Sequence, residues 1–143
     1  MLWRNWKRSV SMGLLFAASF AAVVTVEQLR IERVRESAAL ELVRADWEAA
    51  GAVYKVDSSA MSNFLESRHC SFVLAGADGA PLQYSGVYRE IGAPLPPASN
   101  ATPRLWKFTA EHNPLRAGRY VFFTGVIRDR ADKAYQLTVG RPL

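Results

Sequence analysis

The sequence is poor in cysteine and histidine, with one Cys and two His among 143 residues. A single cysteine cannot form a disulfide within the chain, and structural zinc sites need four Cys or His ligands. The sequence also has no glycine-rich phosphate loop, nucleophile elbow or metal-binding helix motif. These absences exclude a disulfide scaffold and a zinc finger. They also lead us to expect a protein without catalytic residues, cofactor or metal, and therefore not an enzyme.

The one cysteine, Cys70, follows His69 directly, and His112 is the only other imidazole. Neighbouring side chains in a strand point to opposite faces, so His69 and Cys70 cannot readily share a metal or act as a dyad. No spacing pattern brings Cys70 to His112. We therefore expect Cys70 to be a buried free thiol at the start of a core strand.

Positive charge is concentrated at the N-terminus. The formal net charge is +5 and the sequence pI is about 9.7. Arg4, Lys7 and Arg8 supply three of the 18 basic residues, and the remaining basic residues exceed the 13 acidic ones by only two. This balance argues against a nucleic-acid partner.

Residues 9–26 carry no charge. Eighteen residues make a helix of about 27 Å, close to the thickness of the bilayer hydrocarbon core. Trp3 and Trp6 precede the run and suit the membrane interface. The sequence therefore predicts a transmembrane helix at residues 9–28, with the bilayer as a partner.

The flanking charges predict the orientation of this helix. Basic residues precede the apolar run, whereas Glu27 is the first charge after it. The positive-inside rule then keeps residues 1–8 in the cytoplasm and places the C-terminal domain outside. We expect a single-pass protein of the inner (cytoplasmic) membrane. The interface anchors of this helix are Trp3, Trp6, Arg4, Lys7 and Arg8.

A cleaved signal peptide is the alternative for this segment, because Ser19 and Ala21 offer the small residues that a signal peptidase requires. However, the apolar run exceeds the usual 7–15 residues of a signal peptide and continues without a breaker into a helical stretch. We favour a retained anchor.

Small residues recur every fourth position in the predicted span, at Gly13, Ala17 and Ala21. Such residues let membrane helices approach closely. They suggest packing against other membrane or envelope proteins, or against a second copy. The alternative is that alanine is merely tolerated in a single span.

Residues 29–50 contain no Gly or Pro and are rich in helix-forming residues. Leu40, Val43 and Trp47 make an apolar stripe at helical spacing. We therefore predict an amphipathic stalk helix over residues 29–50, packed through this stripe on the following domain. Gly51 is its expected C-cap.

Residues 51–143 are expected to form a small, mainly antiparallel β domain. One or two helical turns are expected within Ser58–Ser67. No helix separates the later strands, and Arg119–Arg128 is apolar on both faces, as in a central strand. The expected strands lie at Ala52–Val56, Cys70–Ala75, Leu82–Arg89, Leu105–Glu111, Arg119–Arg128 and a final stretch containing Tyr135, Leu137 and Val139.

The segment Leu115-Arg116-Ala117-Gly118-Arg119-Tyr120 resembles the tyrosine corner of immunoglobulin-like sandwiches. The resemblance implies an Ig-like sandwich, with Leu115, Gly118 and Tyr120 forming the corner. It also implies that the Tyr120 hydroxyl bonds to the backbone of residues 112–117.

Two other folds remain open. One is a sensor-like α/β sheet, with Leu74–Tyr84 as its first hairpin and the stalk helix across one face. The other is a pilin-like layout, although Ala18 stands where that family requires Glu after Gly13.

Together, these features suggest a non-enzymatic structural or assembly subunit of an envelope complex, such as secretion or pilus machinery. The grounds for this suggestion are the predicted membrane anchor, the stiff helix that follows it and the lack of a recognisable catalytic or binding motif. A ligand-binding or sensing module that works through a partner is the main alternative. An envelope protein encoded by a phage or plasmid is a further one.

Overall fold

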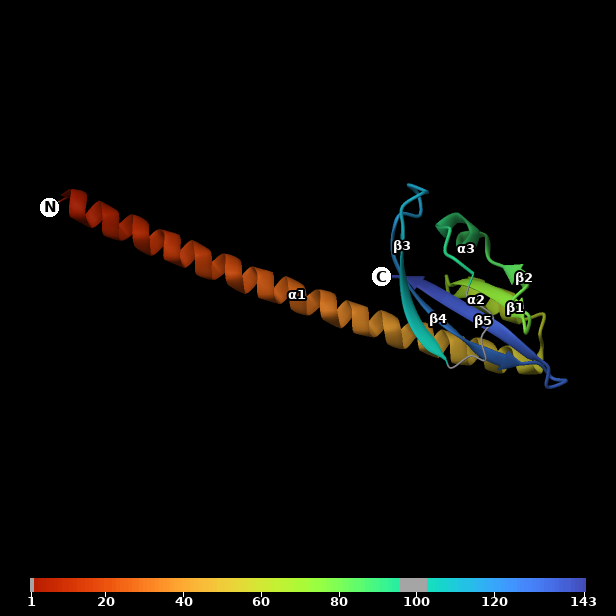
Figure 1. The fold of residues 1–143 in the computed structure, drawn as a ribbon. Helices are drawn as coiled ribbons and strands as arrows, with labels where there is room; N and C mark the ends of the chain where they lie inside the picture. The colour runs from red at the N-terminus through yellow and green to blue at the C-terminus, as the bar shows by residue number, and fades with distance from the viewer. Residues whose placement is uncertain (1, 96–102) are drawn as a thin grey trace. The chain divides into compact units, whose positions relative to one another are not determined.

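The computed structural model of the chain describes residues 2–95 and 103–143 (Figure 1). The chain divides into two compact units, Met1–Glu36 and Ser37–Leu143. Helix α1, Leu2–Val56, contributes residues to both units.

The first unit consists of helix α1 alone. It contains a segment that is long and apolar enough to cross a membrane. Its large apolar side chains are exposed, including Phe16 at 76% and Phe20 at 65%. An exposed apolar run of this length is unfavourable in water, because each such side chain gains about 1.5–3 kcal/mol when it leaves water. The structure thus contains the long, apolar N-terminal helix that the sequence predicts.

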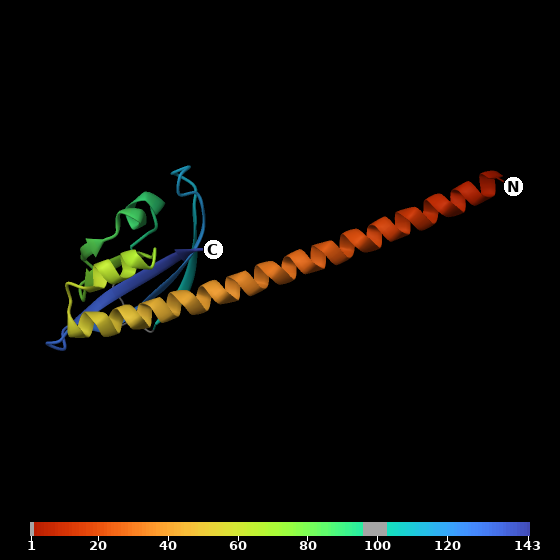
Figure 2. The ribbon, with the colours of Figure 1, turned by 180° about the vertical axis from the view of Figure 1, so that it is seen from behind.

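The second unit is built on one five-stranded sheet with the strand order β2-β1-β5-β4-β3 (Figures 1 and 2). All neighbouring strands are antiparallel. Among the described residues of this unit, two short helices follow α1, and β5 pairs with both β1 and β4. The elements are α2 (Met61–Ser67), β1 (Ser71–Gly76), β2 (Pro81–Tyr84), α3 (Gly86–Ile91), β3 (Arg104–Ala110), β4 (Gly118–Arg128) and β5 (Ala134–Pro142).

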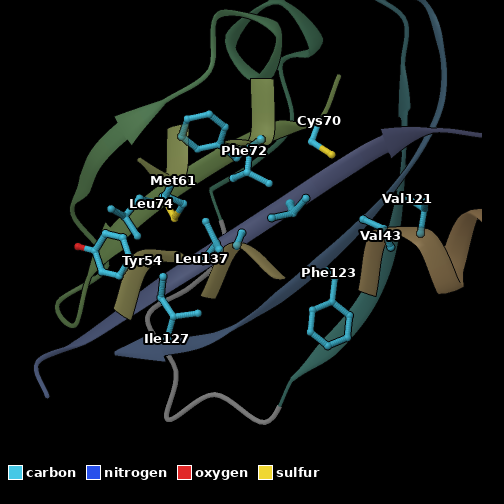
Figure 3. Packing of buried hydrophobic residues seen from close by; sticks show 13 residues of the cluster. Val43, Tyr54, Met61, Cys70, Phe72, Leu74, Val121, Phe123, Ile127 and Leu137 are labelled. Atoms are coloured by element: carbon cyan, nitrogen blue, oxygen red, sulfur yellow. The ribbon is translucent and has the colours of Figure 1, made fainter. Parts of the chain in front are cut away.

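One face of this sheet packs on the C-terminal part of α1 and on α2. Side chains from both helices meet alternate residues of β1, β4 and β5 in one apolar cluster (Figure 3). Leu40 and Trp47, which are partly buried, pack against this cluster, and Val43 lies within it. The stripe predicted from the sequence therefore contacts the domain. The buried members of the apolar cluster are Val43, Ala50, Tyr54, Met61, Leu65, Cys70, Phe72, Leu74, Val121, Phe123, Ile127, Leu137 and Val139.

The opposite face of the sheet has a second apolar cluster, covered by α3. Tyr88 and Ile91 of α3 lie against Phe122, and Trp106 of β3 stacks on the same ring at 4.5 Å between centroids. Strand β4 therefore packs on both faces, as its continuous apolar pattern predicts.

Helix α1 does not end at Gly51 as predicted, but continues to Val56. Residues 52–56 are therefore helical, and the strand expected there was a wrong prediction. Glycine within a helix costs about 1 kcal/mol relative to alanine. Burial of Tyr54 against Tyr135, with ring centroids 5.4 Å apart, offsets this cost. Gly51 itself lies close to Ile127, whose Cγ2 would stand 3.1 Å from an added Cβ.

The strand predicted at residues 82–89 was also partly wrong, because β2 ends at Tyr84 and helix α3 begins at Gly86. The Ser85 side chain accepts a hydrogen bond from the Tyr88 amide and caps the helix. Gly92 follows with φ +71°, the left-handed conformation that ends helices. These two caps outweigh the alternating pattern of residues 82–88.

The long N-terminal helix followed by an antiparallel β domain is confirmed. An Ig-like sandwich packs two sheets face to face, whereas the strands of the described residues form one sheet with helices on its faces. Strands β1 and β2 form a hairpin in which Leu74 pairs with Gln83. The sensor-like α/β sheet and the Ig-like sandwich both stay predictions.

Candidate functional site

The residues predicted to contact the membrane all lie in the first unit. Gly13, Ala17 and Ala21 are exposed on α1, and a Cβ added to Gly13 would meet no described atom within 4 Å apart from its chain neighbours and the backbone of its own helix. Trp3 and Trp6 are 74% and 66% exposed. Arg4, Lys7 and Arg8 are exposed on the same turns of α1. The roles of these residues in anchoring and packing stay predictions.

The corner segment runs from the β3–β4 connection into the start of β4. The Tyr120 hydroxyl donates a hydrogen bond to the Arg116 carbonyl at 2.8 Å, within the stretch where its acceptor was expected. The ring of Tyr120 is buried. Gly118 has φ +145°, a conformation that other residues rarely adopt. Leu115 is 91% exposed and so adds no packing to this corner.

Cys70 lies immediately before β1 and is 4% exposed. Its thiol donates to Asp46 Oδ2 at an Sγ–Oδ2 distance of 3.3 Å. Burial, and then the negative charge of Asp46, raise the pKa of the Cys70 thiol to about 12. The thiol therefore stays protonated at neutral pH and is a poor nucleophile and metal ligand.

The neighbouring His69 has φ 57° and lies in the turn that leads into β1. Within residues 2–95 and 103–143, no group of three or more His, Cys, Asp or Glu side chains comes together that could hold a metal ion.

The most distinctive polar cluster centres on Asp46, which the sequence did not single out. Asp46 lies on α1 and is fully buried. Its Oδ1 accepts a hydrogen bond from Arg68 Nη1 at 3.1 Å. Its Oδ2 accepts hydrogen bonds from Arg141 Nε and from the Cys70 thiol. The carboxylate thus connects α1, the α2–β1 connection and the end of β5.

The sequence contains one weak signal for this cluster. Asp46 lies three residues after Val43 and four before Ala50, so it shares their face of the helix. A charged residue inside an apolar stripe either breaks the stripe or has a buried partner. The partners could not be identified from the sequence, because Arg68 and Arg141 lie 22 and 95 residues away.

The donors around Asp46 account for its burial. A buried carboxylate without partners costs several kcal/mol, whereas charge-assisted hydrogen bonds offset much of that cost. The hydrogen bond to Asp46 raises the pKa of Arg141 above its usual value. Two guanidinium groups therefore face one carboxylate, and the cluster keeps an excess positive charge.

Trp47, the next residue on α1, positions the helix on the sheet. Its indole Nε1 donates to the Leu137 carbonyl at 3.0 Å, and its ring lies 4.8 Å from that of Phe123. A Cβ on Gly125 would stand 2.5 Å from the indole ring, so the glycine leaves the space that Trp47 fills. Asp46 and Trp47 together fix the position of α1 on the sheet.

An open hollow of about 270 Å³ lies between the end of α1 and the β4–β5 turn. Burial, and then Tyr135, raise the pKa of Tyr54 at its edge to about 12. The lining includes Asp57 and Asp129 but also Arg130, so the charges are mixed. We assign no ligand to it.

Comparison with protein-family models, with curated proteins and with solved structures finds no match for this chain. Its function must therefore be inferred from its own geometry.

Proposed function

We propose that this chain is a single-pass protein of the inner (cytoplasmic) membrane. Residues 1–8 are cytoplasmic, residues 9–28 span the bilayer, and the remainder of α1 and the β domain on which it packs lie outside. The apolar segment of α1 and the basic residues before it support this arrangement.

We further propose that the outer domain is a non-enzymatic sensing or ligand-binding module that acts through a partner protein. The observation that carries this proposal is the position of Asp46. The helix that contains the apolar segment also carries this buried carboxylate, which binds two partly exposed arginines. A change at the arginines would therefore act directly on α1.

The mechanism that we propose is a shift between two arrangements of α1 on the sheet. The described arrangement has Asp46 bound by both guanidinium groups. An interaction that draws these groups outward weakens their hold on Asp46 and favours a different arrangement. A ligand can drive such a shift only through a difference in its affinity for the two states.

The test of the sensing proposal is co-purification in mild detergent, comparing the wild type with Asp46→Asn. We expect to recover a partner protein that has an activity of its own. The partner should bind both the wild type and Asp46→Asn, but the partner's activity should differ several-fold between the two complexes. A folded Asp46→Asn variant whose partners keep both composition and activity would contradict sensing. A lone monomer would count against any role that needs a partner.

The second candidate function is a structural or assembly subunit of an envelope complex. The exposed face of Gly13, Ala17 and Ala21 favours it, because small residues allow close packing of membrane helices. Here we expect Ala17→Leu to reduce partner recovery in co-purification. Ala18→Leu is the matched control, since it adds the same volume on a different face. Equal recovery from both variants would mean that this face makes no contact.

A further inference from the structure

The cluster around Asp46 differs in charge from three other ion pairs described in the second unit. Arg44 faces Glu48, Arg116 faces Glu90 and Arg128 faces Asp132, each with one carboxylate. Arg68 and Arg141, in contrast, converge on the single carboxylate of Asp46. One positive charge is therefore left without a carboxylate in the described contacts of this cluster.

Both arginines also reach solvent. The Arg68 side chain is 48% exposed and that of Arg141 is 24% exposed, whereas Asp46 is fully buried. The described contacts with Asp46 use Nη1 of Arg68 and Nε of Arg141. Each guanidinium thus meets the carboxylate from outside and retains further N–H groups for a second acceptor.

The orientation of Arg68 is restricted by a second contact. Its guanidinium carbon lies 4.9 Å from the centroid of the Phe64 ring on α2. Stacking of this kind holds the planar group and leaves its edge available for hydrogen bonds. Arg68 and Arg141 therefore share the buried carboxylate of Asp46, and the partly buried Phe64 ring additionally holds Arg68.

We propose that Arg68 and Arg141 form a binding site for an anionic group with at least two acceptor oxygens, namely a phosphate or a carboxylate. Guanidinium groups bind such anions through paired hydrogen bonds of matching geometry. Asp46 is a positioning residue, because it brings the two guanidinium groups together without contacting the ligand. The group belongs either to a soluble molecule or to a lipid headgroup.

This inference rests on the proposed sensing function for its biological consequence, since it names the ligand class that the module detects. Binding itself needs no partner protein. An anion on the outer edges of Arg68 and Arg141 binds their remaining N–H groups, draws both guanidinium groups outward and so weakens the hold of the sheet on α1.

The test uses the full chain in uncharged detergent, titrated with inorganic phosphate at constant ionic strength. Chemical shifts of the arginine Nε–H groups report binding. We expect saturable shifts at Arg68 and Arg141, with an affinity at least about tenfold weaker in Arg68→Gln. Arg116→Gln is the matched control, because it removes the same charge from an arginine that has its own carboxylate, and it should bind phosphate as the wild type does.

Arg68→Lys provides a second variant that keeps the charge but loses the planar fork, and we expect it to bind more weakly than the wild type. Thermal melts of each variant establish that it is folded. Vesicles of phosphatidylglycerol, compared with phosphatidylcholine, test the headgroup source in the same variants. Binding that is equal in the wild type, Arg68→Gln and Arg68→Lys, or absent for both phosphate and vesicles, would overturn the proposal.

If the sensing proposal is wrong but the anion site exists, the experiments give a different combination of results. In that case phosphate or vesicle binding still depends on Arg68, while partner activity does not respond to Asp46→Asn. The ligand site would then stand without the sensing role.

Discussion

Individual polar side chains join segments of the second unit that are far apart in sequence. Asp46 reaches Arg141 across 95 residues, and Trp47 reaches the Leu137 carbonyl across 90. On the other face of the sheet, Trp106 Nε1 donates to the Thr124 hydroxyl at 2.9 Å. Each of these bonds specifies one arrangement of its elements, because an apolar contact alone tolerates sliding.

Tyr120 provides the first test at this scale. Replacing it with Phe keeps the ring but removes the donor to the Arg116 carbonyl. Loss of one such hydrogen bond costs about 1–3 kcal/mol when the remaining group is poorly solvated. Chemical denaturation of the full chain should show a free energy of unfolding reduced by about that amount.

The control for Tyr120→Phe is Tyr84→Phe. The ring of Tyr84 lies under Arg89, and its hydroxyl makes none of the described hydrogen bonds. We expect this variant to unfold like the wild type. If Tyr120→Phe does so as well, the hydrogen bond at the corner contributes nothing to stability.

Cys70 provides a second test, through pH. Its pKa rises from 9.0 to about 12 in the folded protein. The folded state therefore keeps a proton that the unfolded state loses above pH 9, so stability should fall between about pH 9 and 12. Denaturation midpoints of the wild type and Cys70→Ala, measured across this range, should converge as the pH rises.

At neutral pH, Cys70→Ala should lower the free energy of unfolding by about 1–2 kcal/mol, as a small core truncation does. A thiol reagent at pH 8 should modify Cys70 only after denaturant is added, because the thiolate is the reactive form. Rapid modification of the folded chain would show that the thiol is neither buried nor neutral.

At the scale of elements, helix α1 is held on the sheet by a ring that fits over a glycine. Trp47 occupies the space above Gly125, and its indole bonds to the neighbouring strand β5. The fit depends on the absence of a side chain at one position of β4. A larger residue at position 125 would therefore displace the Trp47 ring, and α1 with it.

We expect Gly125→Ala to destabilise the domain by about 1–3 kcal/mol, since an overpacked core forces a rigid ring to move. Thermal or urea denaturation measures this loss. Gly86→Ala is the control: no atom lies within 4 Å of its added Cβ, and it begins helix α3. That variant should be neutral or slightly more stable. Equal stability of both variants would mean that Trp47 moves without cost.

Elements whose signal is local were predictable from the sequence. The uncharged run at residues 9–26 and the helix formers after it predict a long helix, and α1 is that helix. The two-sided apolar pattern of residues 119–128 predicts a central strand, and β4 lies between β3 and β5. In both cases the side chains of one segment determine its structure.

Elements that depend on distant partners were not predictable. Gly51 has the sequence signal of a helix end, but packing of Tyr54 against Tyr135 extends the helix to Val56. The Asp46 cluster needs Arg68 and Arg141, and its position in the sequence indicates neither partner. The sequence also could not show whether the strands form one sheet or two, because an alternating pattern predicts a strand but does not show which other strand it pairs with.

For the whole molecule, the testable property is its orientation in the membrane. A reporter that is active only outside the cytoplasm should work when fused after Leu143 and fail when fused before Trp3. Reversing the charges of Arg4, Lys7 and Arg8 should produce a mixed orientation, because the positive-inside bias is lost. Opposite results from the two fusions would exclude the proposed topology.

The strand order has a consequence for how the domain is made. Strand β5 is the last of the described strands along the sequence, yet it lies between β1 and β4 and is the only link between the two hairpins of the described sheet. Until residues 134–142 emerge during synthesis, β1–β2 and β3–β4 have no common edge, and two-stranded hairpins are at best marginally stable in water. The two hairpins can therefore join into one sheet only after residues 134–142 have been synthesised. Until then, the apolar faces of α1 and β4 are exposed to chaperones and proteases.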